Sequence, residues 1–347
     1  RAFLGMRIDC LECHDEHREN RNYFGTPDHP IEGRQQHFHE LAAFFSETYR
    51  SDIYGIRDVK KEYFYKYLYD EKESLVKPQV PFYSELLQPN EERRRVQLAN
   101  WLTDPQNGAF SRAIVNRMWA IVTGRPLADP IDDIPLYGPW PPGLEILARD
   151  FADSGYDLQR LIRLIVATEA FRRDSRADFE LTTEHEATWA AFPVTRLRPE
   201  QVAGALTQAS SVTTINDRAS IIAKLQQFGD LNGFVQRYGD MGVDEFTERG
   251  GTITQRLLLM NGDIVRERTK AESELAFSAP ARIATIAKEP GAAVEAAYLC
   301  VLCRKPTPEE AQELAKRLVG KVDAARREAL EDLFWVLINS TEFSWNH

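Results

Sequence analysis

Most of the chain after residue 91 carries apolar residues at the spacing of α-helices with one buried face. In the clearest stripe, Leu158, Leu161, Ile162, Ile165 and Val166 recur every three or four positions, which is the period of an amphipathic helix. Similar stripes predict helices around residues 96–102, 114–122, 294–301 and 330–338. Such helices must bury their apolar faces against one another, so we predict a mainly α-helical fold.

Several helix boundaries are also marked. Asp104-Pro105 and the pair Gly124 and Pro126 are predicted to stop two helices, because proline cannot continue a helix and glycine favours its end. Thr307-Pro308-Glu309-Glu310 has the residues of a capping box, with Thr307 as the N-cap and Glu310 three positions later. Residues 129–143 contain five prolines and are predicted to form a stiff loop.

The sequence suggests three parts. Residues 1–50 hold five of the seven histidines, and residues 51–90 alternate aromatic and charged side chains before three prolines. This alternation favours one or two strands or an extended connector. We therefore predict a small N-terminal segment over residues 1–50, a connector over 51–90, and an irregular multi-helix domain over 91–347.

Composition excludes some classes of protein. The 347 residues include 43 Lys and Arg against 53 Asp and Glu, for a formal charge of -10. This balance argues against a general nucleic-acid-binding protein, which needs a basic surface. No apolar run approaches the ~18–20 residues that cross a bilayer, so no membrane span is predicted.

The four cysteines form two pairs of equal spacing, Cys10 with Cys13 and Cys300 with Cys303. Cys10-Leu-Glu-Cys13-His14 matches the C-x-x-C-H signature of covalent haem attachment. Two thiols three positions apart lie on one side of a helical turn and can add to two vinyl groups, and the adjacent imidazole then binds the iron. From this composition, roughly 0.001 such matches are expected by chance. We predict one covalent haem c held by Cys10, Cys13 and His14.

Other interpretations of the first pair stay open. Cys10 and Cys13 also fit a disulfide, a redox dithiol or half of a zinc site. The second pair lacks a histidine and ends an apolar helix, so Cys300 and Cys303 are predicted to be small buried hydrophobic residues. A local disulfide, a functional thiol pair or a metal pair are the alternatives for them.

The second axial ligand of the iron is predicted from the remaining histidines. His39 is the first candidate, because it lies on a short helix after the loop and can fold back over the ring. His37 and His17 come next, followed by His29, whereas Met6 is too close in sequence to reach the opposite face. A second imidazole gives a low potential, a methionine a higher one, and an open position allows small-molecule or peroxide chemistry.

At this point several runs of residues resemble a known family. Phe3-Leu4-Gly5, the C-x-x-C-H-Asp run and Phe38-His39 through Phe45 are similar to the cytochrome-like domain of large secreted planctomycete proteins. The chain from Arg94 to its end resembles the helical domain of unknown role that accompanies it. The runs that carry this second resemblance are residues 95–105, 115–119, 124–125, 132–133, 154–158, 163–165, 259–262, 304–309 and 337–343.

The resemblance implies that residues 1–50 are the C-terminal part of the cytochrome-like domain, that haem is bound, and that the protein is periplasmic or extracellular. It implies no established activity. The chain departs from the family in two runs. Residues 142–147 lack the histidine of the family's Ser-His-Pro-Glu-Leu-Leu, and the run Cys13-His14-Asp15-Glu16-His17 stands where the family has Cys-His-Asp-His-Pro. The second histidine is thus displaced by one position.

We expect a c-type haem electron carrier, or the cytochrome subunit of a larger extracytoplasmic assembly, whose partner is a redox protein or that assembly. One alternative is a non-redox structural or interaction module whose C-x-x-C is a disulfide or a zinc clip. Another is a haem enzyme of peroxidase type. A carrier or assembly subunit is expected rather than a catalyst, and no acid and base pair for hydrolysis is evident in the sequence.

Overall fold

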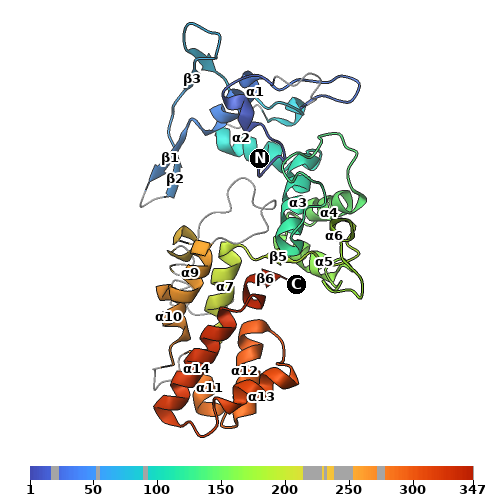
Figure 1. Ribbon diagram of the computed structural model, residues 1–347. Helices are drawn as coiled ribbons and strands as arrows, with labels where there is room; N and C mark the ends of the chain where they lie inside the picture. The colour runs from blue at the N-terminus through green and yellow to red at the C-terminus, as the bar shows by residue number, and fades with distance from the viewer. Residues whose placement is uncertain are drawn as a thin grey trace. The chain divides into compact units, whose positions relative to one another are not determined.

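The protein is mainly α-helical, as the apolar spacing predicts. A computed structural model describes residues 1–16, 23–51, 55–88, 93–213, 229, 233–237, 253–271 and 278–346. The chain divides into two compact units, residues 1–192 and 193–347, whose elements are labelled in Figure 1. This division lies between Phe192 and Pro193, and the predicted boundary near residue 90 stays a prediction.

The first unit combines short irregular elements with a helical part. The short elements are η1 (Asp9–Glu12), α1 (Gln35–Ala42), η2 (Ala43–Phe45), β1 (Thr48–Ser51), β2 (Gly55–Asp58), β3 (Tyr63–Tyr65), β4 (Ser74–Val76) and η3 (Ser84–Leu86). The helical part comprises α2 (Arg94–Leu102), α3 (Gly108–Thr123), α4 (Pro142–Asp153), α5 (Leu158–Ala167) and α6 (Thr183–Ala187).

One hydrophobic core contains residues from both sides of position 90. Leu4 and Leu11 from the N-terminal segment share this core with Phe82 from the predicted connector and with Leu98 and Trp101 of α2. Trp101 is fully buried, so residues before and after position 90 pack together. The connector also holds more strand than predicted, since β1 pairs with β2 and β3 with β4 in two antiparallel hairpins.

The helix boundaries of this unit follow the sequence signals. Gly124 ends α3 with a φ of +82°, a left-handed conformation that glycine adopts without the steric cost of a side chain. Asn107 caps the start of α3, because its Oδ1 accepts a hydrogen bond from the Ala109 amide at 3.3 Å. The predicted proline-rich loop between α3 and α4 is also present, although Pro142 already belongs to α4.

The second unit is a helical bundle whose described ends are paired. Its elements are β5 (Thr195–Arg196), α7 (Pro199–Ala209), α9 (Ile253–Asn261), α10 (Asp263–Thr269), α11 (Ala279–Ile286), α12 (Pro290–Leu302), α13 (Pro308–Lys316), α14 (Asp323–Ile338), η4 (Glu342–Ser344) and β6 (Trp345–Asn346). Strand β5 pairs antiparallel with β6. Helix α14 packs against α10, α11 and α12, with Leu330, Phe334 and Ile338 fully buried.

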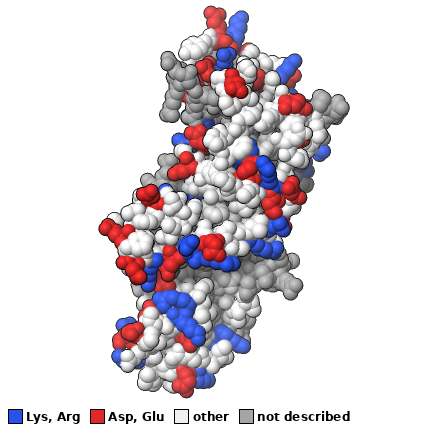
Figure 2. All heavy atoms as spheres, turned by 90° about the vertical axis from the view of Figure 1, so that its right-hand side faces the viewer, with Lys and Arg blue, Asp and Glu red and all other residues white. Residues whose placement is uncertain are grey.

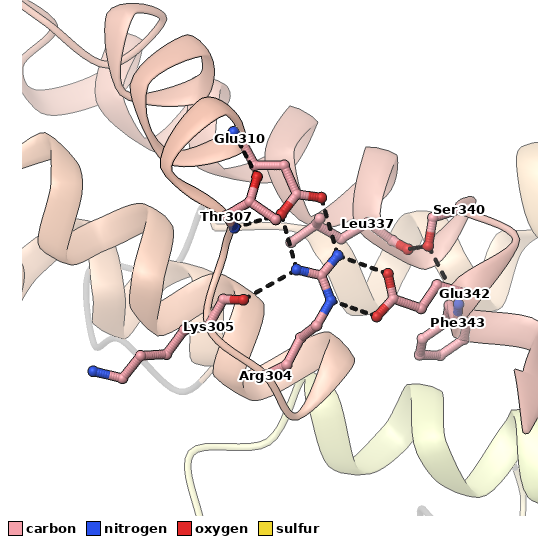
Figure 3. A network of polar contacts seen from close by, with 8 residues as sticks. All are labelled: Arg304, Lys305, Thr307, Glu310, Leu337, Ser340, Glu342 and Phe343. Carbon is pink, nitrogen blue, oxygen red and sulfur yellow. Dashed lines mark hydrogen bonds and ion pairs between the residues drawn. The ribbon is translucent and has the colours of Figure 1, made fainter. Parts of the chain in front are cut away.

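A charged network fixes the turn between α12 and α13 (Figure 3). Arg304 makes two hydrogen bonds to each of two carboxylates, at 2.8 and 3.0 Å to Glu310 and at 2.5 and 2.8 Å to Glu342. The predicted capping box is confirmed, since Thr307 Oγ1 accepts from the Glu310 amide and Glu310 Oε2 accepts from the Thr307 amide. One guanidinium thus ties α13 and η4 to the end of α12.

The surface carries charges of both signs. On the face drawn in Figure 2, basic and acidic side chains are interspersed. Within the described residues, no helix combines the length and the apolar character needed to cross a bilayer.

Candidate functional site

The C-x-x-C-H run begins on the 3-10 turn η1 and continues past its end. Leu11 of η1 is fully buried, whereas Cys10 and Cys13, the residue after η1, are exposed free thiols. Gly33 faces Leu11 so closely that a Cβ there would lie 2.9 Å from both Leu11 methyl carbons. Leu11 therefore anchors the loop in the core and leaves both sulfur atoms facing solvent.

His14 has the hydrogen bond that a metal-binding imidazole needs. Its Nδ1 lies 2.7 Å from the backbone oxygen of Asp15. A carbonyl oxygen can only accept, so Nδ1 carries the proton and the lone pair of the neutral ring lies on Nε2. Histidines that bind metals usually donate their other ring N–H to a carbonyl or carboxylate in this way.

The carbonyl between the two cysteines is held by three donors. The Glu12 oxygen accepts hydrogen bonds from His39 Nε2 at 3.0 Å, from Gln35 Nε2 at 3.0 Å and from the Tyr65 hydroxyl at 3.3 Å. Gln35 and His39 are one turn apart on α1, and both are buried. Helix α1 and strand β3 thus hold the cysteine loop in place through its backbone.

Helix α1 also makes a hydrogen bond to Asp15, the residue after His14. Asp15 Oδ1 accepts a hydrogen bond at 2.7 Å from the backbone amide of Gln35, the first residue of α1. The next residue, Glu16, donates its amide to Gly33 and accepts from the Tyr23 hydroxyl at 2.7 Å. The C-terminal end of the loop is therefore bound to its surroundings.

His39 makes a hydrogen bond through each of its ring nitrogens. Its Nε2 donates to Glu12, and its Nδ1 lies 2.8 Å from the Tyr63 hydroxyl. Its ring stacks on Tyr65 with centroids 3.4 Å apart, and burial lowers its pKa. In this arrangement both nitrogens of a neutral ring are used within the protein, so His39 supports the loop, and its role as distal ligand stays a prediction.

The other candidate residues are dispersed. His37 is half-buried, and its Nδ1 accepts from the Arg34 amide at 3.0 Å; His29 is exposed. Met6 is buried in the core, and His17 lies outside the described residues. Cys300 and Cys303 are both exposed, which corrects the prediction that they are buried. Among the residues described, no three His, Cys, Asp or Glu side chains gather as a possible metal-binding group.

The residues at the loop fit a covalent haem. Thioether formation adds S–H across a vinyl double bond, so it needs two accessible reduced thiols, and Cys10 and Cys13 are both. The tautomer of His14 suits iron ligation through Nε2. Sequence reasoning found these three residues, but it missed the donors Gln35 and Tyr65, because their role depends on contacts across the fold. The alternation of aromatic residues at 63–67 was the one available signal.

Comparison with known proteins covers only part of the chain. Residues 94–230 match a family described as "PSD1: Protein of unknown function (DUF1553)". This stretch begins at the first residue of α2, is less than half of the chain, and does not include the cysteine loop. No curated protein and no solved structure matches the chain.

Proposed function

We propose that the first unit carries one covalent haem c on Cys10 and Cys13, with His14 as an axial ligand, and that the protein transfers electrons outside the cytoplasm. When bound there, the haem would supply a one-electron iron couple. The observation that carries the proposal is the joint orientation of the loop, in which Leu11 is buried, both thiols face solvent, and His14 has its lone pair on Nε2.

The chain's own residues have distinct tasks in this proposal. Cys10 and Cys13 form the two covalent links, and each thiol proton passes to the second carbon of the vinyl group, so no oxidant is needed. The Asp15 carbonyl keeps the proton of His14 on Nδ1. His39, Gln35 and Tyr65 hold the loop backbone through the Glu12 oxygen, which restricts the positions that the two sulfurs can adopt.

Because both thiols face solvent, the arrangement also favours electron transfer to a partner protein over a reaction in a buried active site. A haem attached to side chains that face solvent has an edge within reach of a partner protein. Among the candidates for the second axial ligand, His37, His17 and His29 stay predictions. The peroxidase alternative requires that position to be open to peroxide.

Haem attachment can be tested with a control that the chain provides. The protein is exported from cells that have a c-type haem maturation system, and denaturing gels are stained for haem. We expect a stained band for the wild type and for Cys300→Ser/Cys303→Ser, and none for Cys10→Ser/Cys13→Ser. A wild-type band without stain, with a Cys10–Cys13 disulfide or bound zinc instead, would overturn the proposal and favour the non-redox module.

A further inference from the structure

A cavity of about 650 Å³ lies beside α1, on a face of the helix other than the one that holds the cysteine loop. Ligand pockets commonly enclose roughly 300–1,000 Å³. Val80 and Phe82 contribute apolar lining and are 3% and 5% exposed, respectively. Phe82 packs on Trp101 with ring centroids 5.0 Å apart, so this part of the lining belongs to the core and is formed without a ligand.

Polar side chains of α1 and of the segment before η3 line the remainder of the cavity. Gln36 and Glu40 lie one helical turn apart, and Gln36 Nε2 donates to Glu40 Oε1 at 2.8 Å. The opposite side is joined to the helix, because the Gln79 amide donates to the Glu40 carbonyl at 3.3 Å. Both amide side chains therefore line one cavity, Gln36 from α1 and Gln79 from a segment joined to α1 through the backbone.

The lining also includes a histidine that caps α1 and two side chains of opposite charge. His37 Nδ1 accepts the Arg34 amide as part of the helix cap, so a neutral ring carries its proton on Nε2. Arg34 and Glu32 contribute one charge of each sign to the lining. The cavity thus offers many donors and acceptors with little net charge.

We propose that this cavity binds a neutral carbohydrate of one or two sugar units. Each sugar hydroxyl both donates and accepts, which suits the amides of Gln36 and Gln79 and the carboxyl of Glu40. The C–H face of a sugar ring can lie on the exposed apolar side chain of Ile31, which also lines the cavity. The lining holds one guanidinium and two carboxyls, so it lacks the excess of basic groups that selects phosphate or sulfate.

Binding can be measured with the whole chain and defined probes. Glucose, galactose, mannose, xylose, N-acetylglucosamine and cellobiose are screened by saturation-transfer NMR, and any binder is titrated by calorimetry. Inorganic phosphate is titrated in parallel as an anion. We expect at least one sugar to bind with a Kd below about 10 mM and phosphate not to compete with it.

Variants locate the site. Gln36→Ala/Gln79→Ala removes two hydrogen-bonding amides and is expected to weaken sugar binding about tenfold or more, and Glu40→Gln is expected to weaken it about threefold. Glu73→Gln changes an exposed carboxylate that does not line the cavity and serves as the matched control. Circular dichroism shows whether each variant is folded. Absence of binding by all six sugars, unchanged binding in the folded double variant, or phosphate binding that depends on Gln36 and Gln79 would each overturn the proposal.

Discussion

The imidazole of His39 donates a hydrogen bond to the backbone oxygen of Glu12 at 3.0 Å, which places a buried histidine directly behind the turn that carries Cys10 and Cys13. This contact connects α1 to the cysteine loop through the main chain. It also gives His39 a structural task, because a nitrogen that donates to a carbonyl has no lone pair for iron.

Removal of His39 is expected to destabilise the first unit. His39→Ala deletes two hydrogen bonds and a buried ring, which should lower the free energy of unfolding by about 2–4 kcal/mol. The measurement is urea unfolding followed by circular dichroism, together with hydrogen exchange over residues 9–16. His29→Ala replaces an exposed histidine and should change the free energy by less than about 0.5 kcal/mol. Equal stability of the two variants would contradict the structural role of His39.

The axial ligands of the iron should not depend on His39. If the protein is loaded with haem, His39→Gln is expected to keep the visible spectrum and the spin state of the wild type, because Cys10, Cys13 and His14 are unchanged. The comparison is an absorption and electron paramagnetic resonance spectrum of both proteins. A change to high-spin iron in the variant alone would show that His39 is the distal ligand after all.

Gly33 should be sensitive to a single added methyl group. In Gly33→Ala, the new Cβ would lie 2.9 Å from the methyl carbons of Leu11, so the buried leucine must shift. Overpacking of this kind costs about 1–3 kcal/mol. Gly143→Ala is the control, because no atom lies within 4 Å of a Cβ at that position in α4. Thermal unfolding of both variants measures the difference, and a Gly33→Ala variant as stable as the control would contradict the packing described.

Acid should weaken the second unit through Glu310. Hydrogen bonds from Arg304 lower the pKa of this carboxyl from 4.5 to about 2, so the folded state favours the ionised form. The resulting stabilisation is complete above the unfolded pKa near 4.5 and is lost as the pH falls toward 2. The Glu310 side chain is 33% exposed, and solvent screening reduces the contribution to about 1–2 kcal/mol.

Melting temperatures measured between pH 2 and pH 7 can isolate this contribution. Arg304→Ala should abolish the part of the acid sensitivity that Glu310 supplies, whereas Glu309→Gln, a change in an exposed neighbour, should leave it intact. Identical pH profiles for the wild type and Arg304→Ala would contradict the assignment.

Cys300 should react slowly with alkylating reagents despite its exposure. Desolvation raises the pKa of its thiol, with a smaller contribution from Cys303, and the thiolate is the reactive form. We expect iodoacetamide to modify Cys300 at pH 7 more slowly than an ordinary exposed cysteine, with a rate that still rises above about pH 8.5. The test uses peptide mass spectrometry on Cys303→Ser. A rate that levels off below that pH would contradict the prediction.

The regular helices could be predicted from the sequence because their signals are local. The stripe from Leu158 to Val166 lies in α5, and Thr307 and Glu310 form the expected cap. The packing of residues before position 90 onto α2 could not be predicted in the same way. Pro-rich residues before position 90 resemble a linker, but Phe82 packs on Trp101, and that contact joins segments whose pairing is not encoded locally.

At the candidate site, too, local signals could be recognised in the sequence and contacts across the fold could not. The C-x-x-C-H run is local, so Cys10, Cys13 and His14 could be identified from their order alone. The orientation of His39 depends on Tyr63, Tyr65 and the Glu12 carbonyl, which are brought together by the β3 hairpin and α1. Cys300 and Cys303 were predicted to be buried because they end an apolar helix, but the final turn of α12 leaves both exposed.

The most direct test of covalent haem attachment is the mass of the tryptic peptide spanning residues 8–18, taken from protein matured in a haem-exporting host. The account predicts that this peptide, which contains both Cys10 and Cys13, carries the added mass of one haem. A peptide of unmodified mass, or one lighter by the two hydrogens lost in a disulfide, would contradict it.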